Sequence, residues 1–342
     1  MNYMLHGHGD DGYRYNQEIR ADFSTNVWYG GEPSGLKEHL FAGWPAVNRY
    51  PEVLAENLGR KIALHHHLDA AGILVASGTT ESIYLIAHAF KGHETTIVFP
   101  GFAEYEDACR MHDHRIQFLD WDEVDITTRF NSSLVFICHP NNPTGLLFDH
   151  LQVIIQSNPA TVFVIDEAFI DFTLSAPSLI GLTGEYANLI ILRSLTKAFA
   201  IPGLRLGYIA ASVPLIQKLT LYKMPWTVHT LAIEAGHFIF DNQAVNEIPL
   251  RQLLQDKEDF IRNLQQVPVH TYRSHTHFFL AETACGTAGE LKQYLLGQHG
   301  ILIRDASNFR GLSSRHFRLA TLSPSKNELL VAALHEWQQQ HS

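Results

Sequence analysis

The feature that most constrains the fold of this chain is a series of short, continuously apolar runs in its middle half. They are separated by polar turns and by stretches with helical periodicity, such as residues 81–90 and 148–156. A strand that is apolar at every position needs cover on both faces, which is typical of parallel sheets flanked by helices. The pattern predicts an α/β fold with a mostly parallel seven-stranded sheet, its strands at residues 73–76, 96–99, 116–120, 134–138, 162–165, 189–192 and 206–210.

The pattern changes after about residue 235. A long amphipathic stretch covers residues 243–266, and shorter strand and helix patterns alternate beyond it. We interpret this region as a smaller α+β domain, joined to the large one through a continuous helix. The expected parts are an N-terminal arm with part of the small domain (1–47), a large cofactor-binding domain (48–240) and a small C-terminal domain (241–342). Within the small domain we expect strands at 275–281, 301–304 and 317–320 and helices at 288–296 and 326–340.

Charge and composition exclude several classes of function. The chain has 25 Lys and Arg against 35 Asp and Glu, a net charge of −10, and a surface of this sign repels a nucleic-acid backbone. Three scattered cysteines make neither a disulfide framework nor a zinc knuckle. No apolar run reaches the ~18 residues that a membrane span needs. We therefore expect a cytoplasmic enzyme with no nucleic-acid or membrane partner, in which a local cationic pocket attracts any anionic ligand.

The most informative motif follows the strand at 189–192 and reads Arg-Ser-Leu-Thr-Lys-Ala-Phe. Lys197 is flanked there by Ser194 and Thr196, and Arg205 follows shortly after. A lysine amine can form a Schiff base with a carbonyl cofactor, and the hydroxyl groups and guanidinium can donate hydrogen bonds to a phosphate. The alternative is a solvated lysine at a strand end beside a structural arginine.

Two further motifs also follow buried strands. Asp166 comes directly after the strand at 162–165, at the edge where such sheets bind ligands, and a carboxylate there can keep a pyridine nitrogen protonated. In His-Pro-Asn-Asn-Pro-Thr-Gly, at residues 139–145, the prolines and glycine fix a turn that can aim the Asn142 amide at a cofactor oxygen. A capping acid and an ordinary turn are the alternatives.

The fourth motif, Ser-Gly-Thr-Thr-Glu at residues 77–81, lies between a strand and a helix. Gly78, Thr79 and Thr80 place free backbone amides and hydroxyl groups at a helix N-terminus, which suits a phosphate. An ordinary capping box is the alternative. The glycine patterns of dinucleotide-binding and P-loop proteins are absent.

Together, and in this order, the four motifs resemble those of the fold-type-I pyridoxal-phosphate enzymes, the aspartate aminotransferase superfamily. The resemblance implies pyridoxal 5′-phosphate as the cofactor, with its Schiff base on Lys197 and with Ala168 in the family's Asp-x-Ala motif. It implies that Phe102 stacks on the pyridine ring. It also implies that Tyr50 reaches the cofactor phosphate of the neighbouring subunit in a homodimer with shared active sites. Core packing is the alternative for both aromatic side chains.

Within the superfamily, the chain is most similar to the branch of histidinol-phosphate aminotransferases and threonine-phosphate decarboxylases. This implies that Arg318 grips a substrate carboxylate and that Arg304 binds a substrate phosphate, although either arginine can instead form a structural ion pair. Asn26 and His8 match further substrate-binding positions. Phe169 stands where the aminotransferases usually have tyrosine. Two stretches depart from the decarboxylases: residues 8–11 read His-Gly-Asp-Asp instead of His-Gly-Gly-Asn, and residues 26–29 read Asn-Val-Trp-Tyr instead of Asn-Ile-Asn-Pro.

The substrate implied by the resemblance is a phosphorylated amino acid or amine. We expect decarboxylation of O-phosphothreonine to an aminopropanol phosphate, a step of cobalamin side-chain synthesis. Transamination of histidinol phosphate is the alternative, and the bond at Cα that stands perpendicular to the cofactor ring decides between them. A non-enzymatic sensor and a metal enzyme are less well supported, and we expect no metal, because the clusters at residues 65–67, 112–114 and 275–277 lack a complete ligand set.

Overall fold

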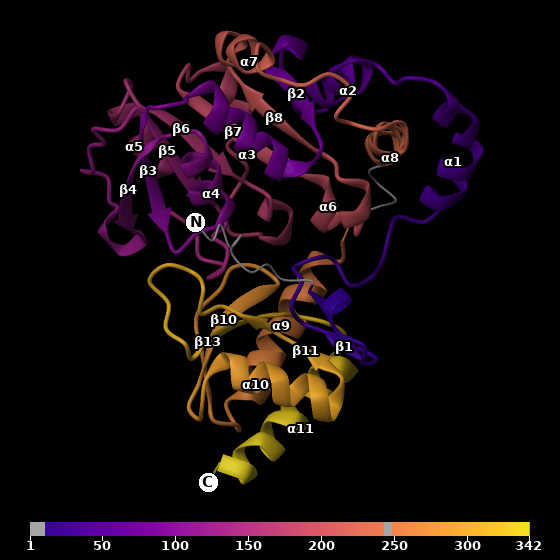
Figure 1. The fold of residues 1–342 in the computed structure, drawn as a ribbon, viewed down its shortest axis with the longest axis vertical. Coiled ribbons are helices and arrows are strands. Elements are labelled where there is room, and N and C mark those ends of the chain that lie inside the picture. The colour runs from indigo at the N-terminus through magenta and orange to yellow at the C-terminus, as the bar shows by residue number, and fades with distance from the viewer. Residues whose placement is uncertain (1–10, 243–247, 342) are drawn as a thin grey trace.

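A seven-stranded sheet forms the centre of the larger part of the computed structural model, which describes residues 11–242 and 248–341 (Figure 1). The strand order is β2-β8-β7-β6-β5-β3-β4, and only β8 runs antiparallel to its neighbours. This confirms the predicted mostly parallel sheet. The strands are β2 (Ile73–Ala76), β3 (Glu94–Phe99), β4 (Arg115–Asp120), β5 (Leu134–Cys138), β6 (Val162–Asp166), β7 (Leu189–Ser194) and β8 (Gly207–Ala211).

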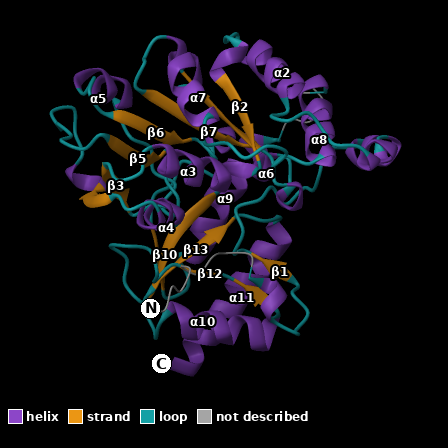
Figure 2. Cartoon of the chain, turned by 45° about the horizontal axis from the view of Figure 1, so that its top comes forward, coloured by secondary structure: helices purple, strands orange, loops and turns teal. Residues whose placement is uncertain are grey.

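Helices cover both faces of this sheet (Figure 2). Ile73 and Val75 of β2 belong to a hydrophobic core shared with α2 (Glu56–His66), α5 (Leu151–Ser157) and α8 (Thr230–Asp241). Leu74, which lies between them, belongs to the opposite core with α3 (Gly78–Ala89), α4 (Glu104–Met111) and α7 (Val213–Thr220). Because successive residues of a strand point to opposite faces, this two-sided burial explains the uninterrupted apolar runs. The short helices α1 (Leu36–Ala42) and α6 (Leu195–Ala198) complete this part.

The smaller part contains a four-stranded antiparallel sheet ordered β12-β13-β10-β9 (Figure 1). The N-terminal strand β1 pairs in parallel with β11, so the first described segment of the chain lies beside residues near its end. The elements are β1 (Ala21–Asp22), α9 (Leu250–Leu264), β9 (Val269–Thr271), β10 (Phe278–Thr283), α10 (Ala288–Tyr294), β11 (Ile301–Leu302), β12 (Arg304–Asp305), β13 (His316–Ala320) and α11 (Pro324–His341).

The expected continuous helix between the two parts is wrong. α8 ends at Asp241, and α9 begins at Leu250 with Pro249 at its N-cap. Proline has no backbone N–H to donate and disfavours a helical conformation in the residue before it, so a helix cannot run through this position undisturbed. The single strand expected at 301–304 is also divided in two, because β11 pairs with β1 and β12 pairs with β13.

Candidate active site

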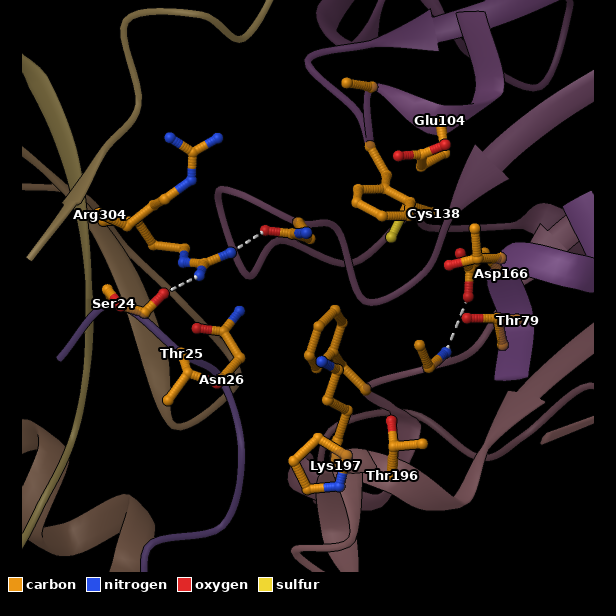
Figure 3. Close-up of a pocket in the computed structure, with 18 of the residues that line it drawn as sticks. Ser24, Thr25, Asn26, Thr79, Glu104, Cys138, Asp166, Thr196, Lys197 and Arg304 are labelled. Carbon is orange, nitrogen blue, oxygen red and sulfur yellow. Dashed lines mark hydrogen bonds between the residues drawn. The ribbon is translucent and has the colours of Figure 1, made fainter. Parts of the chain in front are cut away.

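A cavity of about 280 Å³ lies between the carboxyl ends of the large sheet's strands and the small sheet (Figure 3). Cys138 at the end of β5 and Asp166 at the end of β6 form one side. Arg304 of β12 and Arg318 of β13 form the opposite side, and residues 24–26, which follow β1, form a third. The residues expected from the sequence that line this cavity are Asn26, Thr79, Thr80, Phe102, Asn142, Asp166, Ala168, Thr196, Lys197, Arg205, Arg304 and Arg318.

An amine and a carboxylate face this one cavity. Lys197 lies in α6, the single helical turn that follows β7, and Asp166 ends the adjacent strand β6. Asp166 Oδ2 accepts a hydrogen bond from the Tyr105 hydroxyl at 2.7 Å, and Oδ1 accepts one from the Ala168 N–H at 3.0 Å. Burial raises the pKa of Asp166, whereas these two hydrogen bonds and the charge of Lys197 lower it. The carboxylate is thus fixed in orientation, and three interactions favour its ionised form.

Tyr105 is a site residue that the sequence analysis missed. Its side chain is fully buried in α4 and stacks on Phe136 with ring centroids 5.1 Å apart. Burial raises the pKa of the Tyr105 hydroxyl well above its usual range, so the hydroxyl keeps its proton and can only donate to Asp166. From the sequence alone Tyr105 looks like an ordinary core aromatic. The signal that could have found it is its position one helical turn after Phe102.

Groups that can donate hydrogen bonds to an anion gather at the N-terminus of α3, beside α6 and Arg205, and we call this arrangement the cradle. Thr79, Thr80, Thr196 and Arg205 line the cavity. Gly78 has φ +79°, and a Cβ there would lie 2.6 Å from Nη2 of Arg205, so glycine is what allows the guanidinium to approach the helix N-terminus.

Ser194 does not line the cavity, although the sequence placed it there as a phosphate donor. It is the last residue of β7, and its hydroxyl lies 2.8 Å from that of Thr196. Within the described chain it therefore stands behind Thr196, where it can orient that hydroxyl group but not reach the space in front of it.

Two buried arginines lie side by side on the small sheet. Arg304 and Arg318 are direct partners in the β12–β13 register, so their side chains share one face of the small sheet. Arg318 donates from Nη1 to Asn142 Oδ1 at 2.5 Å and from Nη2 to the Ser24 carbonyl at 2.6 Å. Arg304 donates from Nη2 to Asn308 Oδ1 at 2.9 Å. Burial and the nearby charge of Arg304 lower the pKa of Arg318 to about 9, so Arg318 remains a cation at neutral pH. Burial also lowers the pKa of Arg304.

Unpartnered polar atoms show that the cavity is built for a polar ligand. Both atoms of the Asn26 amide are buried and have no hydrogen-bond partner within residues 11–242 and 248–341, and the same holds for Nε of Arg318. Buried polar groups almost always have a partner. With the cradle at Gly78 and the Lys197–Asp166 arrangement, these atoms fit a group that combines an aldehyde, a basic aromatic ring and a phosphate.

Apolar side chains close the remaining walls. Phe102 lies edge-on to Tyr105 at 5.9 Å, and Phe169 lies edge-on to Phe278 at 4.9 Å. Both line the cavity, as does Phe309, which packs under the Arg304 guanidinium at 5.2 Å. Flat apolar walls exclude water and suit a planar ring.

Glu104, Cys138 and Phe309 are among the lining residues that the sequence analysis missed. Cys138 reads as part of an apolar strand, and burial raises the pKa of its thiol, so it stays protonated. Glu104 is buried at the start of α4, where an acid in the first turn is common. No local pattern distinguishes these residues from structural ones.

Besides Ser194, the expected residues Gly78 and Tyr50 do not line this cavity. The Tyr50 side chain is 85% exposed and contacts Trp226, with ring centroids 5.2 Å apart. It does not line the cavity of its own chain. His8 lies outside the described residues.

Neither a metal cluster nor a membrane span was found in the described part of the chain. It has no group of three or more His, Cys, Asp or Glu side chains arranged to hold a metal ion. None of its helices combines the length and apolar character needed to cross a bilayer.

Comparisons with known proteins agree with this geometry. Residues 36–334 match the family model described as aminotransferase class I and II. The chain is 35% identical to the threonine-phosphate decarboxylase of Salmonella typhimurium, covering 92% of this chain and 90% of that one. It is 29% identical to a histidinol-phosphate aminotransferase of Caldanaerobacter subterraneus, covering 85% and 84%. The crystal structure of L-threonine-O-3-phosphate decarboxylase from Porphyromonas gingivalis superimposes with a TM-score of 0.89 at 37% identity, over 93% of this chain and 99% of that one.

Proposed function

Since this chain belongs to the aminotransferase class I and II family, whose model matches residues 36–334, we propose that it is a pyridoxal 5′-phosphate enzyme that decarboxylates O-phosphothreonine. The observation that carries this proposal is the pairing of Lys197 and Asp166 on one side of a cavity with two buried arginines on the other. The similarity to decarboxylases of that substrate supports it.

The residues of the large sheet would hold the cofactor. Lys197 would bind its aldehyde carbon, and Asp166 would keep its ring nitrogen protonated. The cradle of Gly78, Thr79 and Thr80 would bind its phosphate, with Thr196 and Arg205 as further donors and Ser194 behind them. When bound, the cofactor supplies an electron-poor ring that stabilises negative charge on the substrate Cα.

Asn142 and the apolar walls would orient the ring. Oδ1 of Asn142 accepts from Arg318, so the amide presents its NH₂ group as the donor, which suits the ring's phenolate oxygen. Phe169 offers no hydroxyl there. Phe102 and Ala168 also line the cavity, and the flat ring of Phe102 and the small methyl group of Ala168 suit the two faces of the cofactor ring.

The small sheet would hold the substrate. O-phosphothreonine has two anionic groups, a phosphate and a carboxylate, and Arg304 and Arg318 supply one cation for each. Asn26, with both amide atoms unpartnered, can bind either group. Holding both anions would fix the orientation of the substrate's Cα–carboxylate bond, and the Lys197 amine would return a proton to Cα once carbon dioxide has left.

We also propose that the enzyme is a homodimer in which Tyr50 serves the neighbouring active site. The Tyr50 side chain is exposed and lies outside the cavity of its own chain. Large apolar side chains are also exposed on the stretch of chain around Tyr50 and at Trp226, which contacts it. Exposed apolar surface of this kind marks an interface. The side chains are Phe41, Trp44, Val47, Val53 and Trp226. Sedimentation of the purified protein tests the dimer, and a monomer that retains full activity contradicts it.

One assay separates decarboxylation from the alternative reaction. Purified, cofactor-loaded protein is offered O-phosphothreonine without a keto acid, and histidinol phosphate with 2-oxoglutarate. We expect carbon dioxide and an aminopropanol phosphate from the first mixture. Acceptor-dependent glutamate formation from the second mixture, with no carbon dioxide from the first, would show a histidinol-phosphate aminotransferase instead.

A further inference from the structure

One buried lysine has no role in the site described above. Lys223 follows α7, and its side chain is 1% exposed. Its Nζ lies 2.5 Å from Oε1 of Glu81 and also donates to the Thr227 hydroxyl. A buried ion pair seldom adds more stability than apolar side chains of the same size. The position of the pair, next to the N-terminus of α3, therefore points to a role in placing another group.

The other oxygen of Glu81 reaches the backbone of the anion cradle. Oε2 accepts a hydrogen bond from the Ser77 N–H at 2.5 Å. Ser77 is the N-cap residue of α3, and its own side chain makes no capping hydrogen bond. Lys223, Glu81 and the backbone of Ser77 thus form a continuous chain of contacts that ends where the cradle begins.

The opposite side of this turn packs closely against the Arg205 side chain and the backbone of strand β8. A Cβ at Gly78 would lie 2.6 Å from the Arg205 guanidinium, and a Cβ at Gly207 would lie 3.3 Å from Cα of Gly78. Strand β8 and Arg205 therefore leave the turn little room on their side. On the Ser77 side, the carboxylate of Glu81 provides the restraint, and Lys223 fixes that carboxylate.

We propose that Lys223 is a positioning residue, which acts through Glu81 to hold the backbone of residues 77–80 in the conformation that binds the cofactor phosphate. The inference rests on the proposed function. Lys223 does not line the cavity and touches neither the cofactor nor the substrate. Its removal should therefore weaken recognition of the phosphate while leaving the remaining contacts of the ring in place.

Pyridoxal 5′-phosphate and pyridoxal differ only in the phosphate group, so a comparison of their binding tests this inference. Each is titrated into the apoenzyme, and binding is followed by absorbance. For Lys223→Met we expect the Kd of pyridoxal 5′-phosphate to rise about tenfold to hundredfold, because a small displacement of an oriented binding group has an effect of this size. The Kd of pyridoxal should change by less than about threefold, since it makes no use of the cradle.

The double variant K223M/E81Q tests whether Lys223 acts through Glu81. If Lys223 acts through Glu81, the double variant binds pyridoxal 5′-phosphate no more weakly than the weaker of the two single variants. If the effects of the two substitutions multiply instead, they act independently and the route is wrong. Should K223M fail to fold, as judged by circular dichroism, Glu81→Gln alone carries the test with the same selective loss expected.

Lys218→Met is the matched control. Lys218 lies on α7, with its ammonium 3.5 Å from the centre of the Phe90 ring, and its loss should change neither Kd. Equal weakening of both probes in K223M, or no weakening of either, overturns the inference. A wild-type protein that binds no pyridoxal 5′-phosphate overturns the proposed function instead, so the two failures are distinguishable.

Discussion

The two sides of the cavity are built in different ways. On the large-sheet side, Asp166 and Lys197 follow neighbouring strands, and the parallel topology alone brings their positions together. On the small-sheet side, Arg304 and Arg318 come from two consecutive antiparallel strands, and Arg318 also depends on Ser24 of the N-terminal segment, 294 positions away along the chain. The first side is one continuous sheet edge, which suits the binding of a cofactor. The second side combines segments from different parts of the chain, which suits the recognition of a substrate.

We therefore expect substitutions on the two sides of the cavity to change different kinetic quantities. Changes on the large-sheet side should affect kcat and cofactor binding, whereas changes on the small-sheet side should affect KM and substrate preference.

The largest effect is expected from Lys197→Ala. Loss of the amine removes both the attachment of the cofactor and the proton donor, so kcat should fall by about 10⁴-fold or more. Carbon dioxide release and the visible absorbance of the loaded enzyme measure the loss. Lys218→Ala, remote from the cavity, should behave as wild type. Retention of more than about a tenth of the activity would remove Lys197 from its proposed role.

Arg304→Gln and Arg318→Gln should mainly raise KM. A hydrogen bond to a charged group contributes about 2 kcal/mol, which corresponds to roughly 30-fold in KM. For Arg304→Gln, the Kd of pyridoxal 5′-phosphate should change by less than about threefold, because Arg304 lies on the small-sheet side.

The same two variants test which anion each arginine binds. Arg304→Gln should lose the preference for O-phosphothreonine over threonine, and Arg318→Gln should keep it. Steady-state kinetics with both substrates measures this. A fall in cofactor affinity as large as the rise in KM would contradict the expectation that the two sides of the cavity bind cofactor and substrate separately.

Tyr105→Phe should have a smaller effect, on kcat and on its pH dependence. The Tyr105 hydroxyl stabilises the ionised form of Asp166. Its removal therefore raises the pKa of Asp166, and the acidic limb of the kcat/KM profile should move to higher pH. We expect kcat to fall about tenfold at neutral pH. An unchanged acidic limb would show that Tyr105 only fills space in the core.

The smallest effect concerns stability in acid, with one buried histidine from each part of the molecule. Burial lowers the pKa of His139 to about 4 and that of His277 to about 3. Below the pKa of about 6.5 in the unfolded chain, the unfolded state binds more protons than the folded state. The free energy of unfolding therefore falls with decreasing pH from about 6.5, by up to about 1.4 kcal/mol per pH unit for each histidine.

Denaturant unfolding of the apoenzyme between pH 7 and pH 4.5 measures this loss. His277→Gln should reduce the slope, because glutamine does not titrate. An identical slope in the variant would show that other groups govern the acid sensitivity.

Much of the large sheet could be predicted from sequence, because buried strands have a compositional signal that survives without tertiary information. The strand predicted at 134–138 agrees with β5 residue for residue. The antiparallel direction of β8 could not be predicted, since an apolar run has no orientation. The continuous helix between the two parts was a wrong prediction, although Pro249 was visible, because periodicity on either side outweighed a single residue.

The site was predictable where a residue's role follows from its place after a strand, and hidden where it depends on packing. Lys197, Asp166 and Asn142 follow strands and were found. Tyr105 acts through a hydrogen bond across two elements, and Lys223 acts through contacts 142 positions away along the chain. A single sequence gives no signal for such contacts, because each of the two residues is of a type that is common in its own helix, strand or loop.

The N-terminal segment has a consequence for how the enzyme is made. Strand β1 precedes the large sheet along the chain, yet its partner β11 follows that sheet and begins at Ile301. The Phe23 carbonyl accepts from the Ala320 N–H, and the Trp28 N–H donates to the Lys197 carbonyl. The large sheet can therefore form during synthesis, whereas the wall that contains Asn26 is assembled only after residues up to Ala320 have been translated. Prematurely terminated chains would acquire the lysine without the enclosure that makes it selective.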